Sequence, residues 1–394
     1  MQFNNAKTIT VTRTNKLIAN GLICVLIFGS QSPLLGTEVR YLVLALIALI
    51  ISRFKVRANS KLFSVHIFLI ISLLLLLSLV AMPAYFPPFE HWKFIGIFLS
   101  MLISSIFILD SVGLNRLLKV NFYFVSYTCA VTVPIFILYR FGLIDALSFW
   151  TYEYGGYESK TLIFLNIHMY LDGSLSGRFV GFGSEPGICQ LSWIFAVYYG
   201  LKHKLSVFLI VAVVLAIILG RSPIGTFFVV MLFSTMLTWR SPTVVLAAIL
   251  GISLIYFSID WRIFSDQTGV NKLSGSYLPD RFSRESLMLD NYFHYFLPGG
   301  VYELYPSSIR RDFLGFGGVS QLVQRFGLIF TVVFLSLPLI GKICFKNILL
   351  AAFLMSTLIT QSVFLNPFFF CLWLGIFYYD SDLPRILYSR KSSG

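Results

Sequence analysis

Long apolar runs, separated by short polar segments, dominate the hydrophobic pattern of the chain. Many runs approach the roughly 20 residues that a helix rising about 1.5 Å per residue needs to cross a hydrocarbon core. Helices satisfy their own backbone hydrogen bonds in lipid, so we interpret the runs as helices. The pattern predicts about twelve transmembrane helices, near residues 15–30, 39–52, 62–82, 93–109, 120–138, 186–201, 205–219, 225–238, 243–258, 322–340, 348–361 and 364–379.

Composition supports a membrane protein over a soluble one. Of the 394 residues, 57% are hydrophobic and only 12% are charged, against about 25% charged in soluble domains. Too little polar surface is left to coat a soluble particle. We therefore expect an all-α polytopic membrane protein, with residues 1–394 forming a single transmembrane domain in contact with the lipid bilayer.

The net charge of +13 has a topological explanation. With the N-terminus in the cytoplasm, most lysines and arginines of the short loops fall on the cytoplasmic side, and the short opposite loops hold only Arg40, Lys93 and Arg221. Both termini are then cytoplasmic, which requires an even number of helices. A basic soluble protein would suggest a nucleic-acid partner, but here the positive-inside rule accounts for the charge, and no nucleic acid is expected.

Two long loops, at residues 139–185 and 259–321, fall on the opposite, periplasmic side. This side carries all of the 17 acidic residues except Asp110, Asp380 and Asp382, and its basic residues are mostly arginines. Topology does not explain this enrichment, because long loops translocate regardless of charge. Neither loop shows obvious secondary structure, and structureless loops of this length are usually functional.

The first loop is rich in aromatic residues, including Trp150, Tyr152, Tyr154 and Tyr157. Aromatic rings stack on sugar rings, which makes Tyr154 and Tyr157 candidates for substrate binding. A belt of tyrosine and tryptophan at the membrane interface is the structural alternative, and the two interpretations are compatible.

The same loop ends in the most informative segment of the chain, Arg178-Phe-Val-Gly-Phe-Gly-Ser-Glu-Pro186. Pro186 suits the first turn of the next helix, and Glu185 then lies at the positive end of that helix. One interpretation is a simple helix cap. In the other, a turn loosened by Gly181 and Gly183 holds Arg178 for phosphate binding and Glu185 as a proton acceptor.

The arrangement Arg-x-x-Gly-x-x-x-Glu-Pro before a middle helix, together with two large external loops, resembles the Wzy-type polymerases of O-antigen and capsular polysaccharide. The resemblance covers the layout of most of the chain and one short motif. It implies a GT-C-like fold in the bacterial inner membrane that polymerises undecaprenyl-diphosphate-linked repeat units at the periplasmic face. It further implies a metal-independent reaction without a cofactor, and a chain-length regulator of the polysaccharide co-polymerase type as a possible partner.

The second loop and one short external loop supply the remaining candidates. Arg281 and Arg284, three residues apart, share a face if their segment is helical. By the resemblance, they join Glu185 and Arg178 as catalytic residues that engage the lipid pyrophosphate. The substrate-binding candidates here are Arg221, His294, Arg310 and Arg311.

Two other functions stay open. An O-antigen ligase, which transfers glycan to lipid A core, typically has a histidine just before the helix that follows the second loop, where this chain has Gly318-Val319-Ser320-Gln321. A lipid-linked-oligosaccharide flippase usually has short loops and charges inside its helices, whereas the predicted helices here are nearly free of charge. Both observations favour a polymerase.

No metal site is expected from the sequence. The five cysteines are scattered without metal-ligand spacing, so we interpret them as packing residues. The segment Asp380-Ser381-Asp382 looks like a nucleotide-sugar metal signature, but it adjoins a cytoplasmic helix end, where a solvated end is the simpler interpretation.

Overall fold

Helices lie over nine of the twelve predicted ranges. The computed structural model describes residues 13–31, 46–47, 50, 88–140, 143, 150–154, 157–162, 165–170, 178–183, 186–220, 223–237, 318–336, 345–360 and 366–378. Its helices are α1 (Arg13–Gln31), α4 (Pro88–Val112), α5 (Leu114–Arg140), α6 (Pro186–Lys202), α7 (Val207–Leu219), α8 (Pro223–Leu237), α15 (Gly318–Ser336), α16 (Phe345–Thr360) and α17 (Pro367–Tyr378). The other three predicted ranges, 39–52, 62–82 and 243–258, lie wholly or mostly outside the described residues.

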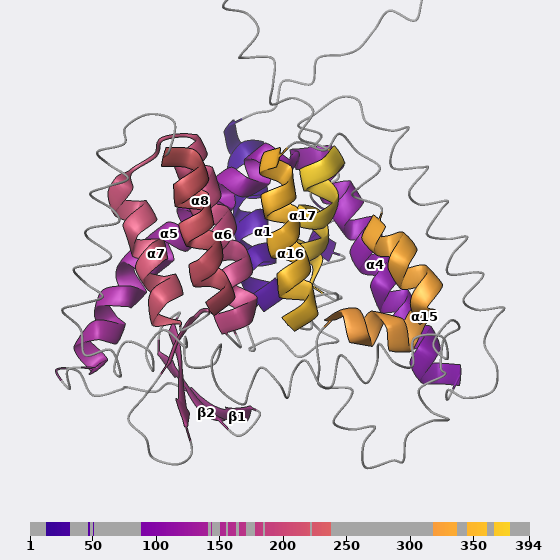
Figure 1. The fold of residues 1–394 in the computed structure, drawn as a ribbon, viewed down its shortest axis with the longest axis horizontal. Coiled ribbons are helices and arrows are strands. Elements are labelled where there is room, and N and C mark those ends of the chain that lie inside the picture. Colours follow the sequence, from indigo (N-terminus) through magenta and orange to yellow (C-terminus); the bar gives the residue numbers. More distant parts are fainter. Residues whose placement is uncertain are drawn as a thin grey trace, which may run out of the picture.

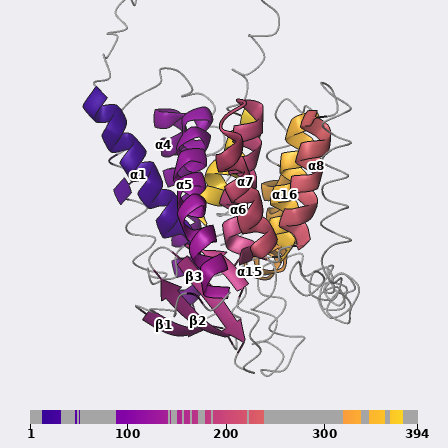
Figure 2. The same cartoon turned by 90° about the vertical axis from the view of Figure 1, so that its left-hand side faces the viewer.

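The helices form one bundle, with a small sheet at one of its ends (Figures 1 and 2). Helix α5 packs along α6 and α7, and α17 packs along α4. Between α4 and α5 the chain turns at Gly113, whose φ of 78° is a left-handed conformation that suits glycine at a helix C-terminus. Its N–H donates to the Leu109 carbonyl at 2.9 Å.

The sheet is a departure from the sequence expectation. We expected no regular structure in the loop at 139–185, but it contains four antiparallel strands in the order β1 (Trp150–Tyr154), β2 (Tyr157–Leu162), β3 (Leu165–Tyr170) and β4 (Arg178–Gly181). The described part of the chain is thus almost entirely helical, with this one sheet added.

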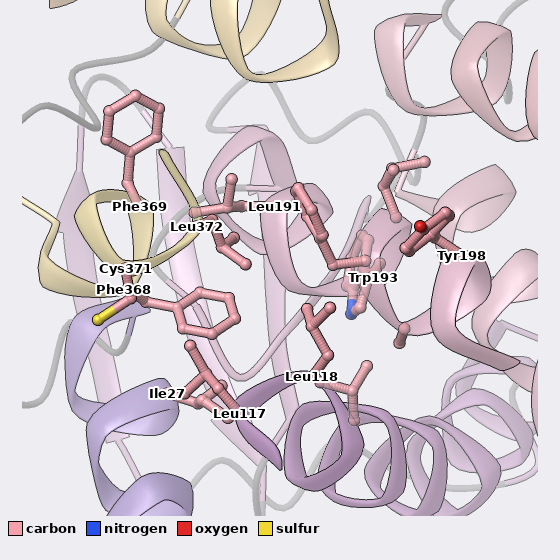
Figure 3. Packing of buried hydrophobic residues seen from close by; sticks show 14 of the residues in the cluster. Ile27, Leu117, Leu118, Leu191, Trp193, Tyr198, Phe368, Phe369, Cys371 and Leu372 are labelled. Atoms are coloured by element: carbon pink, nitrogen blue, oxygen red, sulfur yellow. The ribbon is translucent and has the colours of Figure 1, made fainter. Parts of the chain in front are cut away.

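Aromatic side chains fill much of the core. Phe98 of α4 meets Phe330 and Phe334 of α15 and Phe370 of α17 edge-on, with ring centroids 5.2–5.5 Å apart. These are favourable geometries for the ring quadrupoles. In the neighbouring region, Figure 3 shows Ile27, Leu117 and Phe368, from α1, α5 and α17, as members of the same buried cluster.

The outside of the bundle is also apolar. Helix α7 has no polar residue, and while one side of it is buried, Val207 and Phe208 are 72% and 70% exposed. Exposed apolar side chains also occur on other helices, among them Val131 of α5 and Phe227 of α8. A helix that is apolar all round and half exposed has no face suited to water.

One helical segment among the described residues, Leu114–Tyr139, is both long and apolar enough to cross a membrane. Five shorter apolar segments of 10–17 residues accompany it, at Gly96–Leu109, Val207–Leu219, Ile224–Ser234, Leu349–Leu358 and Pro367–Ile376.

Candidate functional site

The sheet arranges the loop residues in rows. Residues paired across antiparallel strands lie on the same face of a sheet, about 4.7–4.9 Å apart from strand to strand. The register pairs Tyr152 with Ser159, Ser159 with His168, and His168 with Arg178. These four residues, which we call the polar row, therefore cross all four strands on one face.

A second row lies beside the first on the same face. Tyr154 pairs with Tyr157, and Tyr157 pairs with Tyr170. This tyrosine row is offset from the polar row by two residues along each strand, roughly 6.7 Å. The two candidates from the sequence, Tyr154 and Tyr157, thus lie directly opposite each other, and they share a face with Arg178. Four tyrosines, a histidine and an arginine on one face combine groups that stack on rings with groups that bind anions.

Strand β4 joins this face to the helix bundle. Phe179 follows Arg178 and is fully buried; its ring lies 5.7 Å from the Trp193 ring of α6 and 5.5 Å from Phe136 of α5. Phe182, just after the strand, is also buried and contacts the rings of Phe28 in α1 and Phe124 in α5. The segment that carries Arg178 is therefore packed among three helices.

Gly181 of the motif allows the end of strand β4 to pack closely against helix α6. We expected Gly181 and Gly183 to loosen the turn, and for Gly181 the structure shows the reverse. Gly181 has a φ of +71° and is buried, and a Cβ placed on it would meet Trp193 Cζ2 at 2.9 Å. The residue is glycine because the backbone conformation and the close approach of the Trp193 ring both exclude a side chain.

A second glycine contacts the same place from the other side. A Cβ on Gly220, at the end of α7, would meet the Phe179 carbonyl oxygen and Trp193 Cζ3, each at 3.2 Å. Gly220 immediately precedes Arg221 and Phe179 immediately follows Arg178, and these two residues lie against each other. Two of the candidate arginines therefore have immediate chain neighbours in contact with each other.

Helix α6 begins at Pro186, as the sequence predicted. Backbone hydrogen bonds join Phe182 and Gly183 to the thiol of Cys189, which lies in the first turn of α6. These bonds tie the turn after β4 to the first turns of α6. The described cysteines, Cys24, Cys129, Cys189 and Cys371, are all free, and all but Cys24 are buried.

A group of neutral polar side chains is buried deeper in the bundle. Ser192 Oγ of α6 donates to Gln31 Oε1 of α1 at 3.1 Å, and Asn121 Nδ2 of α5 donates to the Ser192 carbonyl at 2.9 Å. Asn366 caps α17 through its Oδ1 and donates from Nδ2 to the Ser30 carbonyl at 3.1 Å. Among the described residues, every buried polar side chain is uncharged. This group joins α1, α5, α6 and α17 by hydrogen bonds.

Several predicted site residues lie outside the described part of the chain. They are Glu185, Arg221, Arg281, Arg284, His294, Arg310 and Arg311. For Arg178, Tyr154 and Tyr157 the structure describes the backbone, which is the basis of the rows above. Of the ten candidates, these three are the ones brought together here.

The sequence analysis did not identify Ser159, His168 and Tyr170, which share the face with Arg178. One signal was present. Tyr154-Gly-Gly-Tyr157 places a Gly-Gly pair between two aromatic residues, a combination typical of two-residue hairpin turns. From that turn, strand alternation would have placed Tyr152 and Ser159 on the same face as the two tyrosines.

Comparison with known proteins adds no relative: no family model matches the chain, and neither does any curated protein or solved structure.

Proposed function

We propose that the chain is a polytopic inner-membrane polymerase of lipid-linked oligosaccharides, with about twelve transmembrane helices, a GT-C-like architecture and cytoplasmic termini. One observation carries the proposal: the polar row with Arg178 lies beside the tyrosine row on one face of a sheet, at the end of an apolar helix bundle. A glycan on a lipid pyrophosphate needs both kinds of group, rings for its sugars and cations for its phosphates.

The surface of the bundle supports the membrane part of this proposal. In water, exposed apolar side chains on α1, α4, α5, α7, α8 and α15 would form a large unfavourable surface. In lipid, the same side chains face acyl chains. Close helix contacts point the same way: a Cβ on Gly200 of α6 would meet Phe122 at 2.7 Å, and one on Gly375 of α17 would meet Leu114 at 2.7 Å. Small residues at such contacts are typical of membrane helix pairs.

The proposed reaction is a glycosyl transfer. A hydroxyl of one lipid-linked repeat unit attacks the anomeric carbon of a second glycan, whose bond to undecaprenyl diphosphate breaks. Glu185 takes the hydroxyl proton, and Arg178, Arg281 and Arg284 stabilise the charge that develops on the leaving diphosphate. Fixed guanidinium groups provide preorganised electrostatic stabilisation, the role that a metal ion would otherwise have.

The neutrality of the buried polar groups favours an enzyme over a flippase. A transporter that moves a charged lipid pyrophosphate would place charged groups along its path, as intramembrane charges usually mark substrate pathways. The buried polar side chains in the described helices are amides and hydroxyls. The arginines of the chain instead concentrate in the external loops.

Surface polysaccharide from a strain that lacks the gene tests the function. We expect a single repeat unit on the surface lipid, the product left when polymerisation fails. Loss of all glycan from that lipid would indicate a ligase, and trapping of the lipid-linked unit in the cytoplasm would indicate a flippase. Complementation with Arg178→Ala should fail to restore polymer at matched protein level, and Arg178→Lys should restore little, because lysine lacks the two-pronged geometry.

A matched control is available at the same end of the bundle. Arg140 ends α5 and lies outside the motif. Arg140→Ala should restore polymer. If Arg178→Ala also restores polymer of normal length, the polar row has no role in the reaction and the proposal loses its main support.

A further inference from the structure

Three lysines and a histidine belong to the end of the bundle opposite the sheet, where α6 ends, α7 begins and α5 begins (Figure 2). Lys119 belongs to α5, Lys202 is the last residue of α6, and His203 and Lys204 lie in the turn between α6 and α7. We call these four residues the cationic corner. Lys119, His203 and Lys204 are exposed.

Three of the four residues, Lys119, Lys202 and His203, lie close enough for their charges to interact. Partial desolvation in the turn lowers the pKa of His203, and the charges of Lys202 and Lys119 lower it further, so both lysines are within electrostatic reach of the imidazole. The His203 ring also lies 4.2 Å from the Tyr199 ring. Lys202 Nζ is 5.5 Å from the centre of the Tyr198 ring and 3.5 Å from its hydroxyl.

Positive charge continues towards α1. The Arg116 guanidinium donates from Nε to Asn20 Oδ1 at 3.0 Å and from Nη2 to the Lys16 carbonyl at 2.6 Å. Against these cations, the described helices carry one acidic residue near this end of the bundle, Asp110 of α4. The sequence predicts Asp380 and Asp382 on the same side, outside the described residues. Basic residues therefore outnumber acidic ones here, and the surplus suits an anion.

Apolar surface begins within one turn of the cationic corner. On α5, residues at four-residue spacing run from Lys119 through Tyr123 to Tyr127 and Val131, and the last two are 59% and 61% exposed. Beside α5, helix α7 opens with exposed Val207 and Phe208 only a few residues after Lys204. An anion held at the corner would thus adjoin two exposed apolar rows that run towards the middle of the bundle.

We propose that the cationic corner binds the phosphate of an anionic phospholipid headgroup, with the acyl chains of that lipid lying along the apolar rows of α5 and α7. The charge surplus selects an anion, and the adjoining apolar rows select a lipid over a free phosphate. Lipids with anionic headgroups are known to occupy basic pockets between helices on the cytoplasmic side of membrane proteins. The inference goes beyond the polymerase reaction, and it depends only on the membrane placement.

Lipid selectivity of the purified full-length chain tests the proposal. Native mass spectrometry in detergent would compare binding of phosphatidylglycerol and phosphatidylcholine with identical acyl chains. We expect phosphatidylglycerol to bind more tightly. Each lysine near a lipid phosphate contributes about fivefold in affinity, so the double variant Lys119→Gln/Lys204→Gln should weaken phosphatidylglycerol binding by about 25-fold and leave phosphatidylcholine binding unchanged.

Lys346, at the start of α16, provides the matched control. Lys346→Gln should keep the preference for phosphatidylglycerol. Equal binding of the two lipids by the unmodified protein would overturn the proposal, and so would a preference that survives the double variant or disappears equally in the control. Displacement of the lipid by millimolar inorganic phosphate would also overturn it, because the corner would then be a free-anion site. No glycan substrate is present in this assay, so its outcome is independent of the polymerase reaction.

Discussion

Gly181→Ala should destabilise the protein far more than an alanine substitution usually does. The backbone at Gly181 has a φ of +71°, and left-handed backbone costs a residue with a Cβ about 1–2 kcal/mol. The new methyl group would also lie 2.9 Å from Trp193 Cζ2. Trp193 is fully buried and packs against Phe179, so its ring cannot shift without disturbing the core. Such overpacking costs about 1–3 kcal/mol, which brings the total to about 2–5 kcal/mol.

Gly96→Ala is the control for this substitution. Gly96 lies inside α4, and a Cβ placed there meets nothing within 4 Å. Alanine in a helix is favoured over glycine by about 0.5–1 kcal/mol, so this variant should be as stable as the parent or slightly more stable. Both variants would be heated in the same detergent, and size-exclusion chromatography of the heated samples would give the midpoint of thermal unfolding for each. Equal midpoints for Gly181→Ala and Gly96→Ala would refute the packing described for the β4–α6 junction.

Three further predictions concern topology, the second loop and pH. Reporter fusions after Gly156 should read as external and fusions after Lys204 as cytoplasmic; the reverse result at either position would invert the orientation. Arg281→Ala and Arg284→Ala should each abolish polymer on a polysaccharide gel at matched protein level. Wild-type polymer from both variants would show that neither arginine takes part in the reaction. Folding lowers the pKa of His203, so the unfolded chain binds more protons at this residue than the folded protein does. Thermal stability should therefore rise with pH between the lowered pKa and the usual histidine pKa of about 6.5. His203→Gln should flatten this rise, and an unchanged pH profile would contradict it.

Helix positions were predictable because a long apolar run has few alternatives. Helix α7 illustrates this: thirteen consecutive apolar residues between Ser206 and Gly220 leave no polar face, and the structure has a helix over that run. The start of α6 at Pro186 followed from the proline alone, since its fixed φ and missing N–H suit a first helical turn.

The sheet was less predictable because its strands do not all alternate between apolar and polar residues: β1 and β3 do, and β2 does not. Strand β2 contains Tyr157, Glu158, Ser159 and Lys160, a sequence that could equally be a loop. Strand β2 pairs with β1 and β3, which are its neighbours along the chain, whereas the pairing of β3 with β4 joins residues ten or more positions apart. The polar row is a product of that pairing, so a list of aromatic and basic residues could not reveal it.

The role of Gly181 shows the same limit at a single residue. The sequence identifies Gly181 between Val180 and Phe182, and a flexible turn is the simplest interpretation. The ring that excludes a side chain belongs to Trp193, twelve residues further on, and the phenylalanine that positions this ring is Phe179. Only the packing of β4 against α6 distinguishes a loosened turn from a tightly packed one.

Reconstitution tests the central claim most directly. The purified chain would be placed in liposomes with an undecaprenyl-diphosphate-linked repeat unit from its host as the only glycan. The account predicts a ladder of glycans that differ by one repeat unit, with one undecaprenyl diphosphate released for each bond formed. The Glu185→Gln variant should slow this ladder by about 10²–10⁴-fold while remaining folded in the membrane. If the unmodified protein leaves the repeat unit at its original length, or only moves it across the liposome membrane, the chain is not a polymerase.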